Sequence, residues 1–162
     1  MVRSLLWILV TIAGLSLANP SKAALGWTWD ECEQHWGQPV SSKRLPDGNL
    51  TANFEAHDLL IVVWLTDDKV ARVAYKANSN GFSETQLVTL QKANTISPTA
   101  TWVFTSKDES TQSYQWELRE IPDNTDWLVT AIYAVKDNVF VVFTEADDQR
   151  AKNASNQAAS GL

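Results

Sequence analysis

Apolar and polar residues alternate along most of the chain with a period of two, which is typical of half-buried β-strands. The alternation and the turn residues between its runs predict strands at 40–45, 50–57, 59–65, 70–76, 102–105, 114–120, 127–135 and 139–144. The run LLIVVWL at 59–65 is apolar at every position, which indicates a strand buried on both sides in the middle of a sheet.

Two stretches depart from this alternation and carry the signals that begin a helix. In the segment 26–39, Thr28 is placed to cap a helix and Glu31 completes a capping box three residues later. A glycine and a proline at the end of that segment are placed to stop the helix. Ser83 and Gln86 form the same box before a second helix, which is predicted to run to about residue 93.

The two predicted helices open two stretches with the same order of elements. Gly26-Trp27-Thr28 begins the first stretch and Gly81-Phe82-Ser83 begins the second, and four predicted strands follow each. This recurrence predicts repeats at about 24–77 and 78–145. We therefore expect an α+β fold, in which two tandem helix-plus-four-strand repeats form one antiparallel sheet with the short helices on one face.

This pattern resembles that of a known family. A helix that opens with glycine, an aromatic residue and Ser or Thr, ends in Gly-x-Pro and precedes antiparallel strands is similar to the half-repeat of the β-lactamase-inhibitor-protein-like fold. The small outer-membrane assembly lipoproteins of the SmpA/OmlA type open in the same way. The resemblance covers 26–39 well and 81–94 in part, and it implies a non-enzymatic binding or scaffolding module.

Both ends of the chain lie outside the pattern. Arg3, a run of 13 apolar residues at 5–17 and a polar segment at 18–23 have the layout of a secretory signal peptide. The run is shorter than the roughly 20 residues that span a bilayer. We expect cleavage after Ala23, with cleavage after Ala18 or an uncleaved anchor as alternatives. The segment 146–162 is rich in Ala, Asn, Ser and Gln and is expected to be a disordered tail, which leaves 24–145 as a single domain.

Charge and cysteine content narrow the class of partner. Removal of residues 1–23 leaves 11 basic side chains (13 − 2) and 19 acidic ones, a net charge of −8 (11 − 19). A chain this acidic is repelled by phosphate backbones and by anionic membranes, so we expect neither a nucleic-acid partner nor stable membrane insertion after cleavage. The lone Cys32 cannot form an internal disulfide. An exported chain without a disulfide favours a bacterial periplasm or a secreted protein.

Few residues are spaced as catalytic or metal sites require. Cys32 and His35 lie three positions apart on the first predicted helix, so a thiolate–imidazole pair is one interpretation. The other places Cys32 in an apolar stripe with Trp29 and Trp36, as a small core residue. Metal sites need three or four ligands, and no motif for a cofactor occurs. We expect no catalytic residue, metal or cofactor; the alternative is a small secreted thiol- or His-dependent hydrolase that uses Cys32 and His35.

The surface most suited to binding is predicted from the tryptophans. Seven of the eight follow residue 23, and two short helices can cover only one face of an eight-stranded sheet. Some rings are therefore expected on the other face or at its rim, where they offer large contact areas; the alternative is that they only fill the core. We predict a surface for binding another protein at Arg72, Trp102, Trp116 and Trp127.

The hairpin around residues 67–68 predicts which face is exposed. A two-residue loop places Trp64 on the same face as Val73 and Tyr75, and Arg72 on the opposite face with Val63. Because a charged head group is rarely buried without a partner, we expect the Trp64 face to be the core and the Arg72 face to be exposed.

Overall fold

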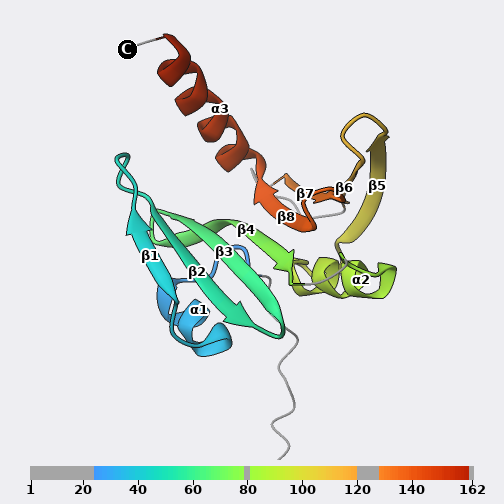
Figure 1. Cartoon of the computed structure of the whole chain (residues 1–162), viewed down its shortest axis with the longest axis horizontal. Coiled ribbons are helices and arrows are strands. Elements are labelled where there is room, and N and C mark those ends of the chain that lie inside the picture. The colour runs from blue at the N-terminus through green and yellow to red at the C-terminus, as the bar shows by residue number, and fades with distance from the viewer. Residues whose placement is uncertain (1–23, 79–80, 120–127, 161–162) are drawn as a thin grey trace, which may run out of the picture.

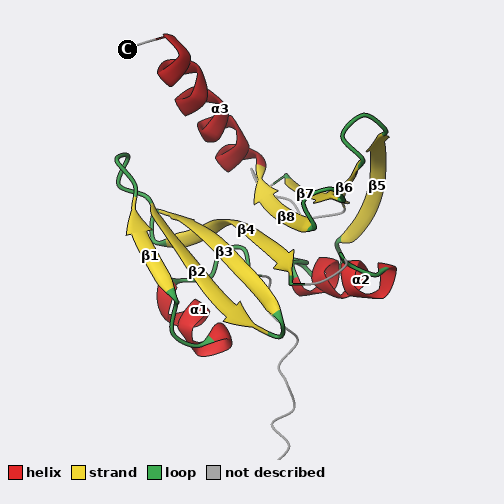
Figure 2. Ribbon diagram, in the orientation of Figure 1, coloured by secondary structure: helices red, strands yellow, loops and turns green. Residues whose placement is uncertain are grey.

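The computed structural model describes residues 24–78, 81–119 and 128–160, and within these ranges the chain forms eight strands and three helices. Figures 1 and 2 show a broad sheet with α1 and α2 packed against it and α3 extending away from it. The elements, in chain order, are α1 (Trp29–Trp36), β1 (Ser41–Arg44), β2 (Leu50–Ala56), β3 (Leu59–Thr66), β4 (Lys69–Ala77), α2 (Glu84–Ala93), β5 (Thr101–Asp108), β6 (Ser113–Arg119), β7 (Val129–Ala134), β8 (Val139–Thr144) and α3 (Glu145–Ser160).

The strands form one sheet in the order β1-β2-β3-β4-β8-β7-β6-β5, and every neighbouring pair is antiparallel. Each half of the chain contributes a helix and a run of four consecutive strands. The last strand of the first half, β4, pairs with the last strand of the second, β8. The predicted α+β class with a single antiparallel sheet is confirmed. Residues 120–127, between β6 and β7, lie outside the described residues.

Both predicted capping boxes are present. The Thr28 amide donates a hydrogen bond of 2.9 Å to the Glu31 carboxylate, and the Glu31 amide donates one of 3.4 Å to the Thr28 hydroxyl. Ser83 and Gln86 make the equivalent pair at the start of α2, with distances of 2.9 and 3.3 Å. These bonds satisfy amides that a helix leaves unpaired in its first turn, so the short helices begin where the sequence predicts.

The core lies between α1, α2 and one face of the sheet, which we call the helix face. On α1, the Trp36 ring lies 5.4 Å from the ring of Phe54 in β2. At the start of α2, the Phe82 ring lies 5.8 Å from that of Tyr133 in β7. Both sheet residues belong to one row of side chains, because the register aligns Phe54, Ile61, Tyr75, Phe140 and Tyr133 across five strands. Both helices therefore cover the same face, and we call the opposite one the open face.

The expected division between core and exposed residues is confirmed for β4, where Val73 and Tyr75 are buried, but is wrong for β3 beyond the hairpin turn. Leu65 pairs with Val70, as a two-residue loop requires, but a β-bulge at Ala71 shifts the register and Trp64 pairs with Arg72. Trp64 and Arg72 thus share the open face, while Val63 and Val73 are fully buried on the helix face. A shift of one residue moves every side chain beyond it to the other face.

Helix α3 occupies the segment that was expected to be a disordered tail. Its 16 residues carry no large apolar side chain, so periodicity could not reveal it. The segment is instead rich in residues with high helix propensity, such as Ala, Gln, Lys and Arg. In the described part of the chain, no helix is long and apolar enough to cross a membrane.

Candidate functional site: the open face of the sheet

Side chains on the open face lie in three rows that cross the central strands. The middle row contains Val62, Ala74, Val141 and Ile132, and its neighbours contain Leu60, Lys76, Val139 and Ala134 on one side and Trp64, Arg72, Phe143 and Thr130 on the other. We call the apolar members Leu60, Val62, Trp64, Ala74, Ile132, Val139, Val141 and Phe143 the open-face patch. All of them are half-buried except Ala74, which is buried.

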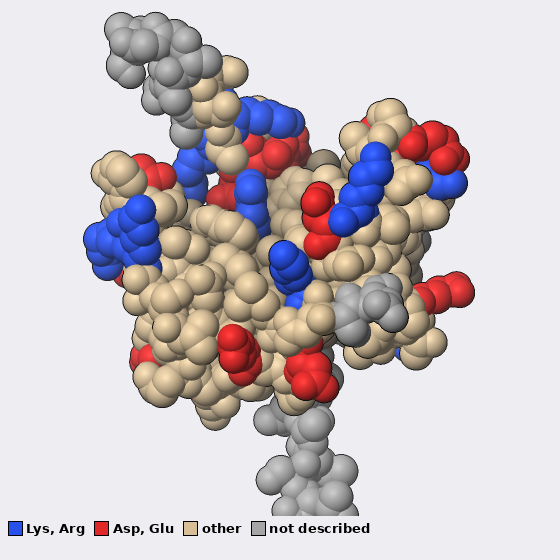
Figure 3. Space-filling view, in the orientation of Figure 1, with Lys and Arg blue, Asp and Glu red and all other residues tan. Residues whose placement is uncertain are grey.

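The size of the open-face patch follows from sheet geometry. Four strands about 4.8 Å apart and three rows about 6.8 Å apart give a footprint of roughly 19 Å by 20 Å, or about 400 Å², which also contains Arg72, Lys76, Thr130 and Ala134. The patch lies on the face of the sheet opposite α1 and α2, and α3 contacts this face at Arg72 and Thr66. Figure 3 shows that uncharged side chains cover much of this view, with charged side chains among them in its middle.

Arg72 lies at the edge of the open-face patch and is held on three sides. Its guanidinium lies 5.8 Å from the Trp64 ring centroid and 5.5 Å from that of Phe143. Its Nε donates a 2.7 Å hydrogen bond to Asp147 of α3. The side chain remains 24% exposed, so the charge is paired with a carboxylate and two aromatic faces while it keeps contact with water.

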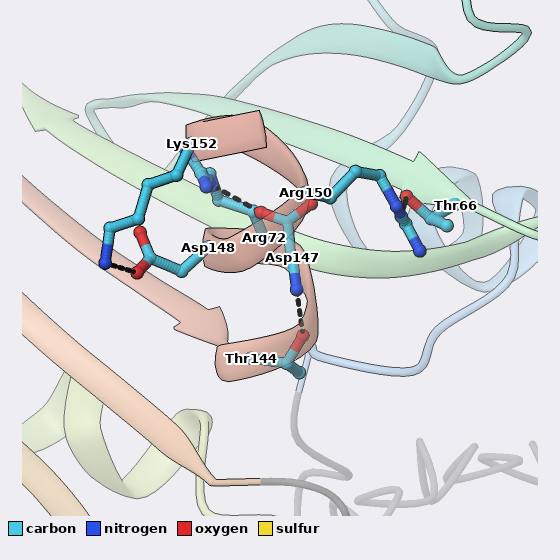
Figure 4. A network of polar contacts seen from close by, with 7 residues as sticks. All are labelled: Thr66, Arg72, Thr144, Asp147, Asp148, Arg150 and Lys152. Carbon is cyan, nitrogen blue, oxygen red and sulfur yellow. Dashed lines mark hydrogen bonds and ion pairs between the residues drawn. The ribbon is translucent and has the colours of Figure 1, made fainter. Parts of the chain in front are cut away.

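The first turns of α3 are attached to the sheet by polar contacts (Figure 4). The Thr144 hydroxyl accepts a 3.3 Å hydrogen bond from the Asp147 amide, as an N-cap does. The Arg150 guanidinium donates a 2.6 Å hydrogen bond to the Thr66 hydroxyl. A pocket of about 240 Å³ lies between these turns of α3 and the β3–β4 hairpin, with Val70 and Ala71 among its lining residues.

The structure does not bring the predicted binding residues together. Arg72 lies on the open face, but Trp102 and Trp116 belong to β5 and β6 and face the helix side. The Trp102 indole donates hydrogen bonds to the Gln91 carbonyl (2.8 Å) and the Thr95 hydroxyl (3.1 Å), which holds the ring against α2. Trp127 lies outside the described residues.

Sequence reasoning missed most of the open-face patch, including Val62, Val141 and Phe143. A signal for it was nevertheless present. The segments 59–65 and 139–143 are apolar at odd and even positions alike. Only one set can face α1 and α2, so the other set must form an apolar surface on the far side of the sheet.

Cys32 and His35 point to different environments. Cys32 is 0% exposed, and burial raises the pKa of its thiol to about 12, so the thiolate that a nucleophile requires is disfavoured at neutral pH. The His35 ring is exposed and stacks on Trp27, with ring centroids 4.2 Å apart. Among the described residues, no group of three or more His, Cys, Asp or Glu side chains is arranged to hold a metal ion.

Comparison with known proteins identified no relative. The chain matches no family model, no curated protein and no solved structure.

Proposed function

We propose that this protein is a secreted or periplasmic, non-enzymatic module that binds another protein through its open face. One observation carries the proposal: seven half-buried apolar side chains and one buried one lie together on the side of the sheet away from α1 and α2, within a footprint of about 400 Å². Contiguous apolar side chains at a protein surface commonly mark binding sites. The paired strands beneath the patch hold its backbone in a fixed register, which lowers the entropic cost of association.

We further propose that the two halves are structural repeats. Gly26 and Gly81 both have positive φ, 83° and 90°, and each precedes an aromatic residue and a capped helix. Four consecutive antiparallel strands follow each helix, and the sheet order runs outward from the β4–β8 pair in both directions. Export is proposed from the signal-like segment at 1–23 and from the acidic chain with one cysteine.

The proposal is tested by using the exported protein as bait in the envelope fraction of its own cell. Val62→Lys and Val141→Lys each place a charge in the open-face patch, while Val88→Lys does the same on α2, where Val88 is 41% exposed. Circular dichroism verifies that each variant is folded. We expect the two patch variants to lose a partner that wild type and Val88→Lys recover. Recovery of the same partner by the patch variants would show that the open face is not the binding surface.

A further inference from the structure

The charges on the open face have the opposite balance to those of the whole chain. Register places Lys43 in the row of Trp64, and Lys76 between Leu60 and Val139. Neither lysine makes an ion pair with a described residue. The other strand charges on this face are Lys69, Arg72, Arg119, Glu55, Asp108 and Glu117, so five basic side chains accompany three acidic ones in a chain with a net charge of −6.

Internal pairing leaves a smaller set of charges available to a ligand. Arg72 is paired with Asp147, and Arg119 with Glu117. Lys43, Lys69 and Lys76 remain available, against Glu55 and Asp108, and the Asp108 carboxylate already accepts hydrogen bonds from Ser110 and Thr111. Figure 3 shows basic side chains in the middle of this view as well as nearer its margins. The positions that can still form ion pairs with a ligand are therefore mainly basic.

The dimensions of the open-face patch indicate what kind of element covers it. A stable protein–protein interface buries about 800 Å² on each partner, roughly twice the area of this patch. An α-helix is about 10 Å wide and rises 1.5 Å per residue, so a helix of about 13 residues spans the 20 Å of the patch. One or two helices therefore fit the patch, whereas a second copy would need a larger area and would bring lysines against lysines.

We propose that the open face binds an amphipathic helix of the partner protein, with an apolar stripe flanked by acidic residues. The apolar stripe packs on Val62, Val141 and Phe143, as helices pack on one face of a sheet. The acidic flanks pair with Lys43 on β1 and with Lys76, which lies in the outer row between Leu60 and Val139. This inference rests on the proposed function, to which it adds the shape and charge of the ligand.

The test uses three labelled 16-residue synthetic helices and the purified exported protein. The first has a leucine stripe with glutamate flanks, the second has lysine flanks, and the third has glutamine in place of the leucines. We expect the glutamate helix to bind at least tenfold more tightly than the other two by fluorescence anisotropy. The double variant Lys43→Glu/Lys76→Glu should weaken it at least tenfold, because attraction becomes repulsion.

A matched double variant controls for net charge. Lys92→Glu/Lys136→Glu changes the charge by the same amount on α2 and in the β7–β8 turn, and it should bind the glutamate helix like wild type. If the glutamate and lysine helices bind equally well and Val141→Lys abolishes the binding of both, the proposal of an acidic helix is overturned. The proposed function is then left intact. Helix binding that Val141→Lys does not change would overturn both.

Two other occupants would also overturn the inference. Sedimentation velocity that detects a dimer, lost in Val141→Lys, would assign the open face to a second copy. Binding to vesicles of anionic lipid, lost in Lys43→Glu/Lys76→Glu, would assign it to a membrane surface. We expect a monomer and no vesicle binding.

Discussion

Trp64 and Arg72 stabilise each other across two neighbouring strands of the open face. The guanidinium lies near two aromatic rings and a carboxylate, an arrangement that contributes roughly 0.5–2 kcal/mol for each cation–π contact, depending on exposure. Because the arginine remains partly exposed, this stabilisation does not require removing a charge from water. At the scale of single residues, a half-buried ring thus contributes less to the free energy of unfolding than a core ring of similar size.

This difference predicts two unequal substitutions. Phe54 is 0% exposed and contacts α1 through Trp29 and Trp36, so Phe54→Ala should lower the free energy of unfolding by about 3–5 kcal/mol. Trp64→Ala should cost about 1–2 kcal/mol, because it removes a cation–π contact and a partly buried ring. Urea denaturation measures both. A cost for Trp64→Ala equal to that of Phe54→Ala would place Trp64 in the core.

Cys32 illustrates how burial controls reactivity. Its thiol is fully buried and its pKa is raised to about 12, chiefly by burial and next by the negative charge of Glu31. We expect thiol reagents to modify the native protein at least 100-fold more slowly than the urea-unfolded protein at pH 8, because the thiolate is the reactive form. Labelling at the same rate in both states would show an accessible thiol and support the hydrolase alternative.

The same pKa predicts the direction of a pH effect on stability. In the unfolded chain the thiol loses its proton near its ordinary pKa of 9.0, whereas the folded thiol keeps it to about 12. Above pH 9 the unfolded state therefore binds fewer protons, and the free energy of unfolding falls as the pH rises. Chemical denaturation of wild type and Cys32→Ala at pH 8 and pH 10.5 measures this contribution. We expect the free energy of unfolding to fall less between pH 8 and pH 10.5 in Cys32→Ala than in wild type. An equal fall in both proteins would contradict a contribution from Cys32.

At the scale of elements, features that depend on residues close together in the sequence are predicted correctly, and features that depend on long-range contacts are not. The capping boxes at Thr28 and Ser83 and the hairpin turns depend on residues a few positions apart, so the sequence reveals them directly. The bulge at Ala71 depends on a long-range contact, because Val70 exchanges hydrogen bonds with Gly26 and Trp27 (2.7 and 2.8 Å) rather than only with β3. No pattern within the hairpin reports that contact, which explains why the wrong face was assigned to Trp64.

Helix α3 was missed for a related reason. A helix without an apolar stripe gains little from packing, and isolated helices of this length are marginal in water. Its attachment comes from Arg72 and Thr66, about 80 positions earlier in the chain. The contacts that fix α3 therefore cannot be read from its own sequence.

The attachment of α3 predicts a local effect. Asp147→Asn removes the charge that pairs with Arg72 and should weaken the attachment by about 1–2 kcal/mol, because hydrogen bonds between charged groups exceed neutral ones. Hydrogen exchange of the amides at 148–152 should then accelerate about 5–30-fold. Asp148→Asn is the matched control, since Asp148 pairs only with Lys152 of the same helix among the described residues. Equal acceleration in both variants would show that loss of helix charge, rather than loss of attachment, is responsible.

At the scale of the whole molecule, the first described residues bear on processing. Ala24 is 2% exposed and Leu25 is 5% exposed, and both belong to the core. Cleavage after Ala23 would place a charged amino group directly on a core residue, which is costly. Cleavage after Ala18 leaves five residues before Ala24. We therefore expect mass spectrometry of the exported protein to find Asn19 as the first residue; a first residue of Ala24 would contradict this.

The pairing of β4 with β8 also determines when folding of the sheet can be completed. During synthesis, β8 begins 62 positions (139 − 77) after β4 ends. Until then the edge of β4 is unpaired, and such an edge can recruit strands from other chains. Closing so distant a pair is slow compared with forming hairpins. A nascent chain that stops before Val139 is therefore expected to aggregate, and the last strand matters more than the last helix for a soluble product.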